Sequence, residues 1–154
     1  VFTDSMTWTD DKGRRMRLWM PDEVFIDDTE EFMDMLTDRA VEIISTEPID
    51  IYVNSTYLPA RIADQYDELW TPERMDRVIA AAVENDVAIE INARFKLPSA
   101  AFIKRAKKAG ATFSFGTNNG GAVDIGNLEY CREMIIECNL QPGDMFVPKK
   151  GDLK

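Results

Sequence analysis

The side chains best suited to chemistry stand at the ends of three short apolar segments, 49–53, 87–91 and 111–115. They are Asn54 after the first segment, Glu90, Asn92 and Arg94 in and after the second, and Thr117, Asn118 and Asn119 after the third. If the segments are parallel strands, their carboxyl ends meet at one edge of a sheet, where such folds bind ligands. Carboxylate, amide and guanidinium groups gathered there could act as a general base, hold a divalent cation, or bind a small polar or phosphorylated molecule.

Glu90 is the most informative of these residues, because a carboxylate inside an apolar strand is costly to bury without a partner. Two interpretations are open. In the structural one, Glu90 pairs with Arg94 or Arg61. In the functional one, it is a ligand for a divalent metal ion or a general base.

The loop from Gly116 to Gly121, with the sequence Gly-Thr-Asn-Asn-Gly-Gly, also has two interpretations. Its backbone amides could bind an anion if they open a helix, or the segment could be a plain turn. It matches neither the dinucleotide-binding fingerprint nor the phosphate-binding P-loop.

The amino-acid composition excludes or disfavours several classes of function. The chain of 154 residues has no histidine, so it cannot supply a Ser-His-Asp triad, a Cys-His pair or a His-rich zinc site. The formal net charge is −10, with no basic stripe interleaved with aromatic residues, which disfavours direct nucleic-acid binding. No apolar run approaches the length of a membrane span.

The elements that must position these residues follow from hydrophobic periodicity. Segments 2–9 and 14–21 alternate around a turn that contains Gly13, which predicts an N-terminal β-hairpin. A helix is expected from about Thr29 to just before Pro48, and further helices are expected from Thr71, from Ser99, and over about 125–138. With strands at 49–53, 87–91 and 111–115, the order is that of parallel βα units. The chain is too short for a complete eight-fold barrel, so it is either an open sheet or part of a barrel.

We expect residues 1–154 to form a single domain. Because the sequence opens at Val1 rather than at Met, it is expected to begin inside a longer protein or after processing. Cys131 and Cys138 are two helical turns apart, too far for a disulfide, and are expected to be buried thiols. Cysteines that are buried and not joined in a disulfide favour a reducing compartment such as the cytoplasm.

The order of several motifs resembles the C-terminal half of the PHP (polymerase and histidinol phosphatase) domain over residues 49–148. The motifs are Ala88-Ile-Glu-Ile-Asn92, Leu97-Pro98-Ser99, Ala106-Lys-Lys-Ala-Gly110, Phe113-Ser-Phe-Gly116-Thr117 and Gly126-Asn-Leu-Glu129. The resemblance implies a distorted (β/α) barrel whose strand ends bind a cluster of metal ions, Zn, Mn or Mg, for phosphoester hydrolysis. The expected fold is therefore a partial (β/α) barrel of PHP or TIM-like type with an N-terminal β-hairpin.

The sequence departs from the family pattern at the metal ligands. Asn118 stands where the family has a metal-binding Asp, Gly120 where it has His, and Asn54 where an earlier strand ends in His. Neutral amide oxygens are poor substitutes in a transition-metal site. By the resemblance, Glu90 and Asn118 would hold the catalytic positions, and Asn54, Asn92, Arg94, Thr117 and Asn119 would bind substrate.

Two functions follow. The chain is a fragment of a divergent PHP-like phosphoesterase that works with a missing N-terminal half, or it is a non-catalytic module that binds a small polar or phosphorylated ligand or serves a structural role. A partial barrel would leave apolar surface uncovered, so a homo-oligomer is a further expectation.

Overall fold

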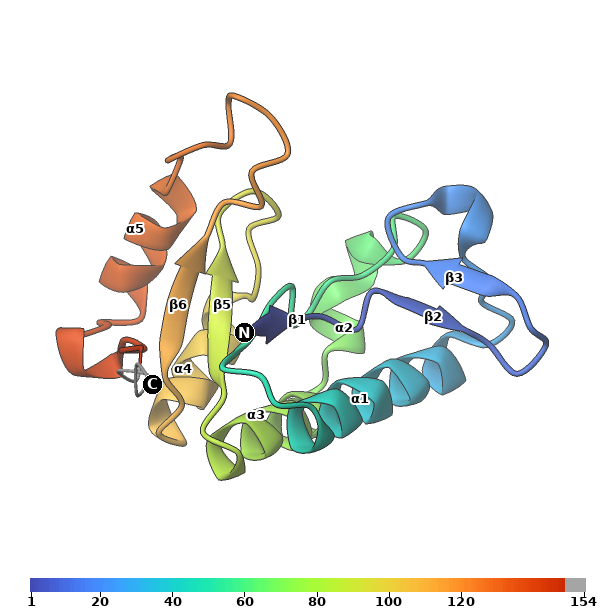
Figure 1. The fold of residues 1–154 in the computed structure, drawn as a ribbon, viewed down its shortest axis with the longest axis horizontal. Coiled ribbons are helices and arrows are strands. Elements are labelled where there is room, and N and C mark those ends of the chain that lie inside the picture. Colours follow the sequence, from blue (N-terminus) through green and yellow to red (C-terminus); the bar gives the residue numbers. More distant parts are fainter. Residues whose placement is uncertain (149–154) are drawn as a thin grey trace, which may run out of the picture.

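The computed structural model describes residues 1–148 and shows a mixed α/β architecture built on a four-stranded parallel sheet (Figure 1). The strand order is β1-β4-β5-β6, with bounds β1 (Phe2–Thr3), β4 (Ile51–Tyr52), β5 (Ala88–Asn92) and β6 (Phe113–Gly116). A separate antiparallel hairpin consists of β2 (Thr7–Thr9) and β3 (Arg15–Arg17). The parallel βα units expected from the sequence are confirmed.

Helices connect successive strands of the sheet, and one follows the last strand. They are α1 (Thr29–Thr46), α2 (Tyr66–Leu69), α3 (Pro72–Glu84), α4 (Ala100–Lys108) and α5 (Glu129–Glu137), with 3-10 turns η1 (Pro21–Glu23), η2 (Ala63–Gln65) and η3 (Pro142–Asp144). Side chains cap three of them: Asp28 accepts from Glu31 N, Thr71 from Arg74 N and Ser99 from Phe102 N. The predicted starts of α1, α3 and α4 are confirmed within a residue or two.

The last helix is shorter than predicted. The expected helix over 125–138 begins only at Glu129, because Gly126 has a φ of 74° and residues 121–127 form turns instead. The loop that leaves β6 therefore does not lead directly into a helix, and its amides are not a helix N-terminus.

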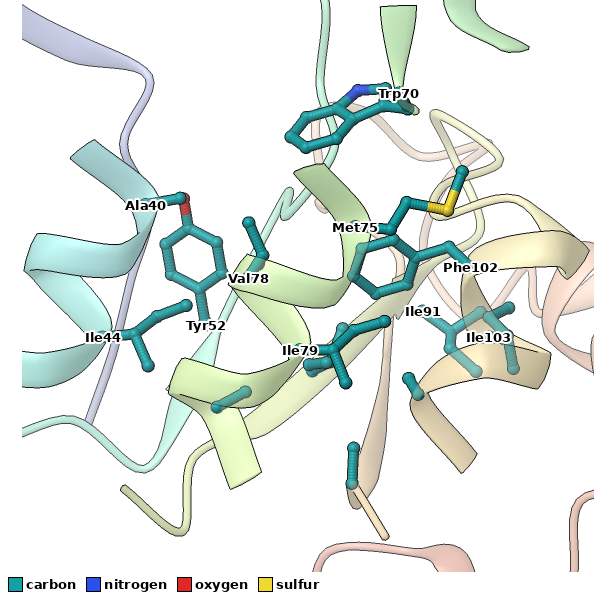
Figure 2. Packing of buried hydrophobic residues seen from close by; sticks show 14 of the residues in the cluster. Ala40, Ile44, Tyr52, Trp70, Met75, Val78, Ile79, Ile91, Phe102 and Ile103 are labelled. Carbon is teal, nitrogen blue, oxygen red and sulfur yellow. The ribbon is translucent and has the colours of Figure 1, made fainter. Parts of the chain in front are cut away.

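The core lies between the sheet and the helices on one of its faces. Strand register places Tyr52, Ile89 and Phe113 side by side on that face, and all three are completely buried. Figure 2 shows Tyr52 between Ala40 of α1 and Val78 of α3. Burial of such side chains is the main stabilising term for the sheet.

Helices α1 and α3 are also joined by a buried arginine. Arg74 of α3 pairs with Glu30 at 2.8 Å and with Asp34 at 2.7 Å, and it donates to the carbonyl of Leu69 at 2.9 Å. Its side chain is only 8% exposed. Every edge of its fork thus has an acceptor, as a buried guanidinium requires.

The N-terminal segment corrects one prediction. The stretch 2–9 does not form a single hairpin strand: Phe2 and Thr3 pair in parallel with Ile51 and Tyr52, and only Thr7–Thr9 pairs with β3. The break occurs at Asp4, whose carboxylate accepts from Met6 N at 2.9 Å and turns the chain. The main sheet thereby gains a strand, and the hairpin lies apart from β5 and β6 (Figure 1).

Two other sequence expectations bear on the described residues. Cys131 and Cys138 are buried free thiols, as their spacing predicts. Over residues 1–148, none of the helices combines the length and the apolar character that crossing a membrane would need.

Candidate functional site

A cavity of about 530 Å³ opens beyond the carboxyl ends of β1, β4, β5 and β6. We call it the rim cavity. Its lining residues are Asp4, Met6, Trp19, Asn54, Tyr57, Arg94, Phe95 and Asn118. The size is typical of sites for small molecules, and the location is the one that parallel sheets favour for ligands.

Two residues that follow neighbouring strands form one wall of the rim cavity. Asp4 leaves β1 and Asn54 leaves β4, and the Asn54 amide Nδ2 donates to Asp4 Oδ2 at 3.3 Å. Asn54 has a φ of 53°, a left-handed conformation that Asn tolerates better than most residues. The two side chains present one carboxylate and one amide to the cavity.

Behind this wall, Asn92 organises the site from a fully buried position. Its Nδ2 donates to Asn54 Oδ1 and to Glu90 Oε2, both at 3.1 Å. Its Oδ1 accepts from the backbone N–H groups of Arg94 and Phe95, each at 3.0 Å. Asn92 therefore holds both the wall and the loop that carries Arg94.

The environment of Glu90 differs from the structural interpretation of the sequence. Its Oε2 accepts from the Asn54 backbone N–H at 3.2 Å and from Asn92, and among the described residues it pairs with neither Arg94 nor Arg61. The expected arginine partner is therefore wrong, since neutral amides satisfy the carboxylate. Glu90 is 9% exposed and is not part of the cavity lining.

The absence of a side chain at Gly116 makes room for Glu90. A Cβ atom built on Gly116 would lie 1.8 Å from Glu90 Oε1, well inside van der Waals contact. Gly120 plays the same part for Arg94, because a Cβ atom there would lie 1.4 Å from Arg94 Nη1. The glycines of this segment thus allow close approach to two charged side chains.

Arg94 is the cationic group of the rim cavity. Its Nη1 lies 3.1 Å from Asp124 Oδ2, and its side chain is 39% exposed. This ion pair ties the loop after β6 to the loop after β5. A guanidinium has five N–H donors, so Arg94 can hold Asp124 and still bind an acidic group.

Aromatic side chains form the remaining wall. Tyr57 and Phe95 meet edge to face with ring centroids 5.0 Å apart, and the Arg94 guanidinium carbon lies 5.6 Å from the Phe95 ring centroid. Burial raises the pKa of Tyr57, and Arg94 partly offsets this rise. The hydroxyl of Tyr57 is therefore neutral at physiological pH and can serve as a hydrogen-bond donor.

The three residues predicted after β6 are spread out. Asn118 lines the rim cavity, in a left-handed conformation with a φ of 61°. Thr117 and Asn119 instead bond to each other, Oγ1 to Oδ1, at 2.6 Å, and neither is part of the lining. The structure thus brings Asn54, Arg94 and Asn118 to the cavity, with Asn92 and Glu90 directly behind.

The cavity is also lined by five residues that are not among the predicted site residues: Asp4, Met6, Trp19, Tyr57 and Phe95. Asp4 could have been predicted as a site residue, because it follows a parallel strand as Asn54 does. The predicted hairpin over residues 2–9 assigned Asp4 to a strand instead. Trp19 reaches the rim from outside the sheet, in the segment after β3. No periodicity in the sequence marks it as a lining residue.

We tested whether these residues suit the metal cluster that the resemblance implies. Within residues 1–148 there is no group of three or more His, Cys, Asp or Glu side chains that could hold a metal ion. The carboxylates of Asp4 and Glu90 each accept a hydrogen bond from Asn54. The donor set therefore does not form a preassembled cluster for Zn or Mn, and we derive no chemical step through a metal.

The nearby thiol of Cys131 is not suited to nucleophilic chemistry. It is buried and donates to the Ile91 carbonyl at 3.3 Å. Burial, with the nearby Glu90 charge, raises its pKa to about 11. The reactive thiolate is therefore scarce at physiological pH.

Comparisons with protein-family models, curated proteins and solved structures gave no match for this chain.

Proposed function

We propose that this chain binds a small phosphorylated molecule in the rim cavity, without hydrolysing it. The observation that carries the proposal is the single guanidinium of Arg94, held at a cavity that the amides of Asn54 and Asn118 also line. Arginine suits phosphate because its planar fork matches phosphate oxygens.

The rest of the lining narrows the ligand further. Asp4 presents a carboxylate, which accepts hydrogen bonds and repels a second anionic group. The ligand therefore carries a hydroxyl or amino group in addition to its phosphate. The rings of Trp19, Tyr57 and Phe95 supply apolar surface, as ligand sites usually do.

The placement of Glu90 supports binding rather than catalysis. A general base must reach the proton that it removes, and Glu90 lies behind the cavity wall, where its Oε2 accepts from two N–H donors and its Oε1 lies close to Gly116. The resemblance to phosphoesterases places Asn118 in a metal-ligand position, and a neutral amide there is a weak ligand. These residues explain how a pocket of hydrolase type could keep its ligand and lose its chemistry.

The test is calorimetric titration of the chain with glycerol 3-phosphate and with inorganic phosphate. We expect saturable binding that weakens as salt is raised. Arg94→Gln should reduce affinity at least tenfold, because hydrogen bonds between charged groups contribute about 1.5–3 kcal/mol.

Lys96→Gln is the matched control. Lys96 lies in the same loop and loses the same charge, but it does not line the cavity. Equal losses from Arg94→Gln and Lys96→Gln would show that the net charge of the chain, not the cavity, governs binding. That outcome, or an absence of saturable binding, would refute the proposal.

The competing expectation is a metal-dependent, PHP-like phosphoesterase. One observation favours it: two carboxylates, Asp4 after β1 and Glu90 in β5, each accept a hydrogen bond from Asn54, which follows the strand between them. Thermal unfolding with Mg²⁺, Mn²⁺ and Zn²⁺ tests it, because a metal bound only to the native state raises the melting temperature. A shift lost in Glu90→Gln would favour this function over simple binding.

The same resemblance makes the sheet part of a (β/α) barrel, which we propose as the larger architecture. The edge strand β1, with Phe2 70% exposed, is where further strands or a second copy would add. Sedimentation equilibrium tests the homo-oligomer; a monomer at all concentrations would refute it.

A further inference from the structure

Two other hollows adjoin the rim cavity. One, of about 400 Å³, we call the side cavity; it is lined by Leu18, Trp19, Pro21, Val24, Tyr57, Pro59, Ala60 and Arg61. The other, of about 450 Å³, we call the outer hollow; it is lined by Tyr57, Leu58, Ala60, Ala63, Tyr66, Phe95 and Leu97. Apart from Arg61 and two tyrosines, neither has a polar side chain in its lining.

The rim and side cavities have two walls in common, Trp19 and Tyr57. A molecule seated at Arg94 that extends between these two rings therefore enters the side cavity. The polar groups lie at one end of this path and the aliphatic residues at the other. Such a division fits a ligand with a charged head and an apolar arm.

The lining of the side cavity favours an apolar occupant. Leu18 is 2% exposed and Val24 is 9% exposed, so the inner wall is formed by core residues. Trp19, in contrast, is 46% exposed, a large ring that nothing in the described chain covers fully. An arm lying against Trp19 would remove apolar area of both partners from water.

The outer hollow is a weaker candidate for the arm. It is the more open of the two, and Trp19, the large exposed ring, does not line it. It shares Tyr57 and Phe95 with the rim cavity, and Phe95 already packs against Tyr57. An arm in the outer hollow would therefore leave the Trp19 ring exposed.

We infer that the side cavity binds an apolar arm, a short alkyl chain or a phenyl ring, of the same molecule whose phosphate lies at Arg94. The inference rests on the proposed function and assigns the ligand to a class, the phosphate monoesters of small apolar alcohols that carry a further polar group. Trp19 and Tyr57 are then the residues that determine specificity.

The experiment compares methyl, butyl and phenyl phosphate by calorimetry. Each methylene that enters the side cavity should raise affinity by up to about fourfold. We therefore expect butyl and phenyl phosphate to bind at least tenfold more tightly than methyl phosphate. Equal affinities across the series would overturn the inference, whereas binding of methyl phosphate that depends on Arg94 would still support the proposed function.

Two variants close the side cavity in different ways. Val24→Phe fills it from the inner wall, and Arg61→Trp covers it from an exposed position, which keeps the test valid if Val24→Phe does not fold. Both variants should abolish the gain in affinity that the butyl and phenyl groups provide. Both should leave the affinity for methyl phosphate unchanged. Ala63→Trp fills the outer hollow instead and should leave the gain intact. Loss of the gain in Ala63→Trp alone would place the arm in the outer hollow and overturn the inference.

Discussion

The carboxylate of Glu90 occupies the space that a side chain at Gly116 would need. The separation of 1.8 Å between Glu90 Oε1 and a Cβ atom at residue 116 means that the two cannot coexist without movement. Glu90 is held from the opposite side by the amide of Asn92 and the backbone of Asn54. The position of this buried charge thus depends on a glycine in the next strand.

Gly116→Ala should therefore destabilise the fold by about 1–3 kcal/mol, the usual cost of overpacking. The backbone at Gly116 has no positive φ, so the loss comes from crowding rather than backbone strain. Urea unfolding measures it. Gly121→Ala is the control, since nothing lies within 4 Å of a Cβ atom there and its φ is also not positive. If Glu90→Ala in the Gly116→Ala background recovers no stability, contact with Glu90 is not the cause.

Asn92→Ala should cost about 2–4 kcal/mol, because it removes a fully buried side chain and leaves the N–H groups of Arg94 and Phe95 without their acceptor. Chemical denaturation gives the loss directly. We also expect weaker ligand binding, since the loop carrying Arg94 loses its anchor. A change below 1 kcal/mol would contradict the central role given to Asn92.

Asn92→Asp should make stability depend on pH. The substitution keeps the acceptor for the Arg94 and Phe95 N–H groups, but it places a second carboxyl beside Glu90. Like charge and burial would raise the pKa of the introduced carboxyl in the folded state. Stability should then be nearest to wild type at low pH and fall as pH rises through that pKa. Denaturation at pH 5 and pH 8 measures this pH dependence. An equal loss of stability at both pH values would argue against repulsion between the two carboxylates.

Cys131 should contribute to alkaline instability. Its pKa is raised to about 11 in the folded protein, so the unfolded thiol ionises first as pH rises. Its contribution to stability is complete below about pH 8.5 and is lost as pH rises toward 11. Cys131→Ala should flatten the stability curve between pH 9 and pH 10.5. Rapid alkylation of the native thiol at pH 8 would contradict the burial described here.

Arg74→Met should destabilise the contact between α1 and α3 by about 1–3 kcal/mol, because Glu30, Asp34 and the Leu69 carbonyl lose a common donor. Arg77→Met is the matched control on the same helix. Arg77 pairs with Asp38 at the surface, where such pairs contribute about 0–1 kcal/mol. Thermal unfolding of both variants distinguishes them, and equal losses would refute a special role for Arg74.

The sequence allowed the parallel βα order, the start of α1, α3 and α4, and the meeting of Asn54, Glu90 and Asn92 to be predicted. These features depend on local patterns: apolar periodicity, capping residues, and the rule that polar residues gather at strand ends. Gly110, expected to end a helix, does follow α4 and has a φ of 89°. Such positions are decided by a few neighbouring residues.

The parts that could not be predicted depend on contacts between distant residues. Phe2 and Thr3 alternate like a hairpin strand, but tertiary pairing with Ile51 and Tyr52 determines their partner. Trp19 reaches the rim cavity through the path of the hairpin, and Arg94 finds Asp124 across a loop rather than Glu90. Neither the position of Trp19 nor the Arg94–Asp124 ion pair produces a periodic pattern in the sequence.

The loop between β5 and α4 is closed by its own backbone. Asn92 N donates to the Leu97 carbonyl at 2.7 Å, and Leu97 N returns a bond to the Asn92 carbonyl at 3.2 Å. Within this loop, the side-chain oxygen of Asn92 also accepts from the backbone N–H groups of residues 94 and 95. None of these bonds uses the side chains of Arg94 or Phe95, so both positions can change identity while the loop keeps its shape. Arg94 and Phe95, which line the rim cavity, can therefore be redesigned, or change in evolution, without loss of the hydrogen bonds that close this loop.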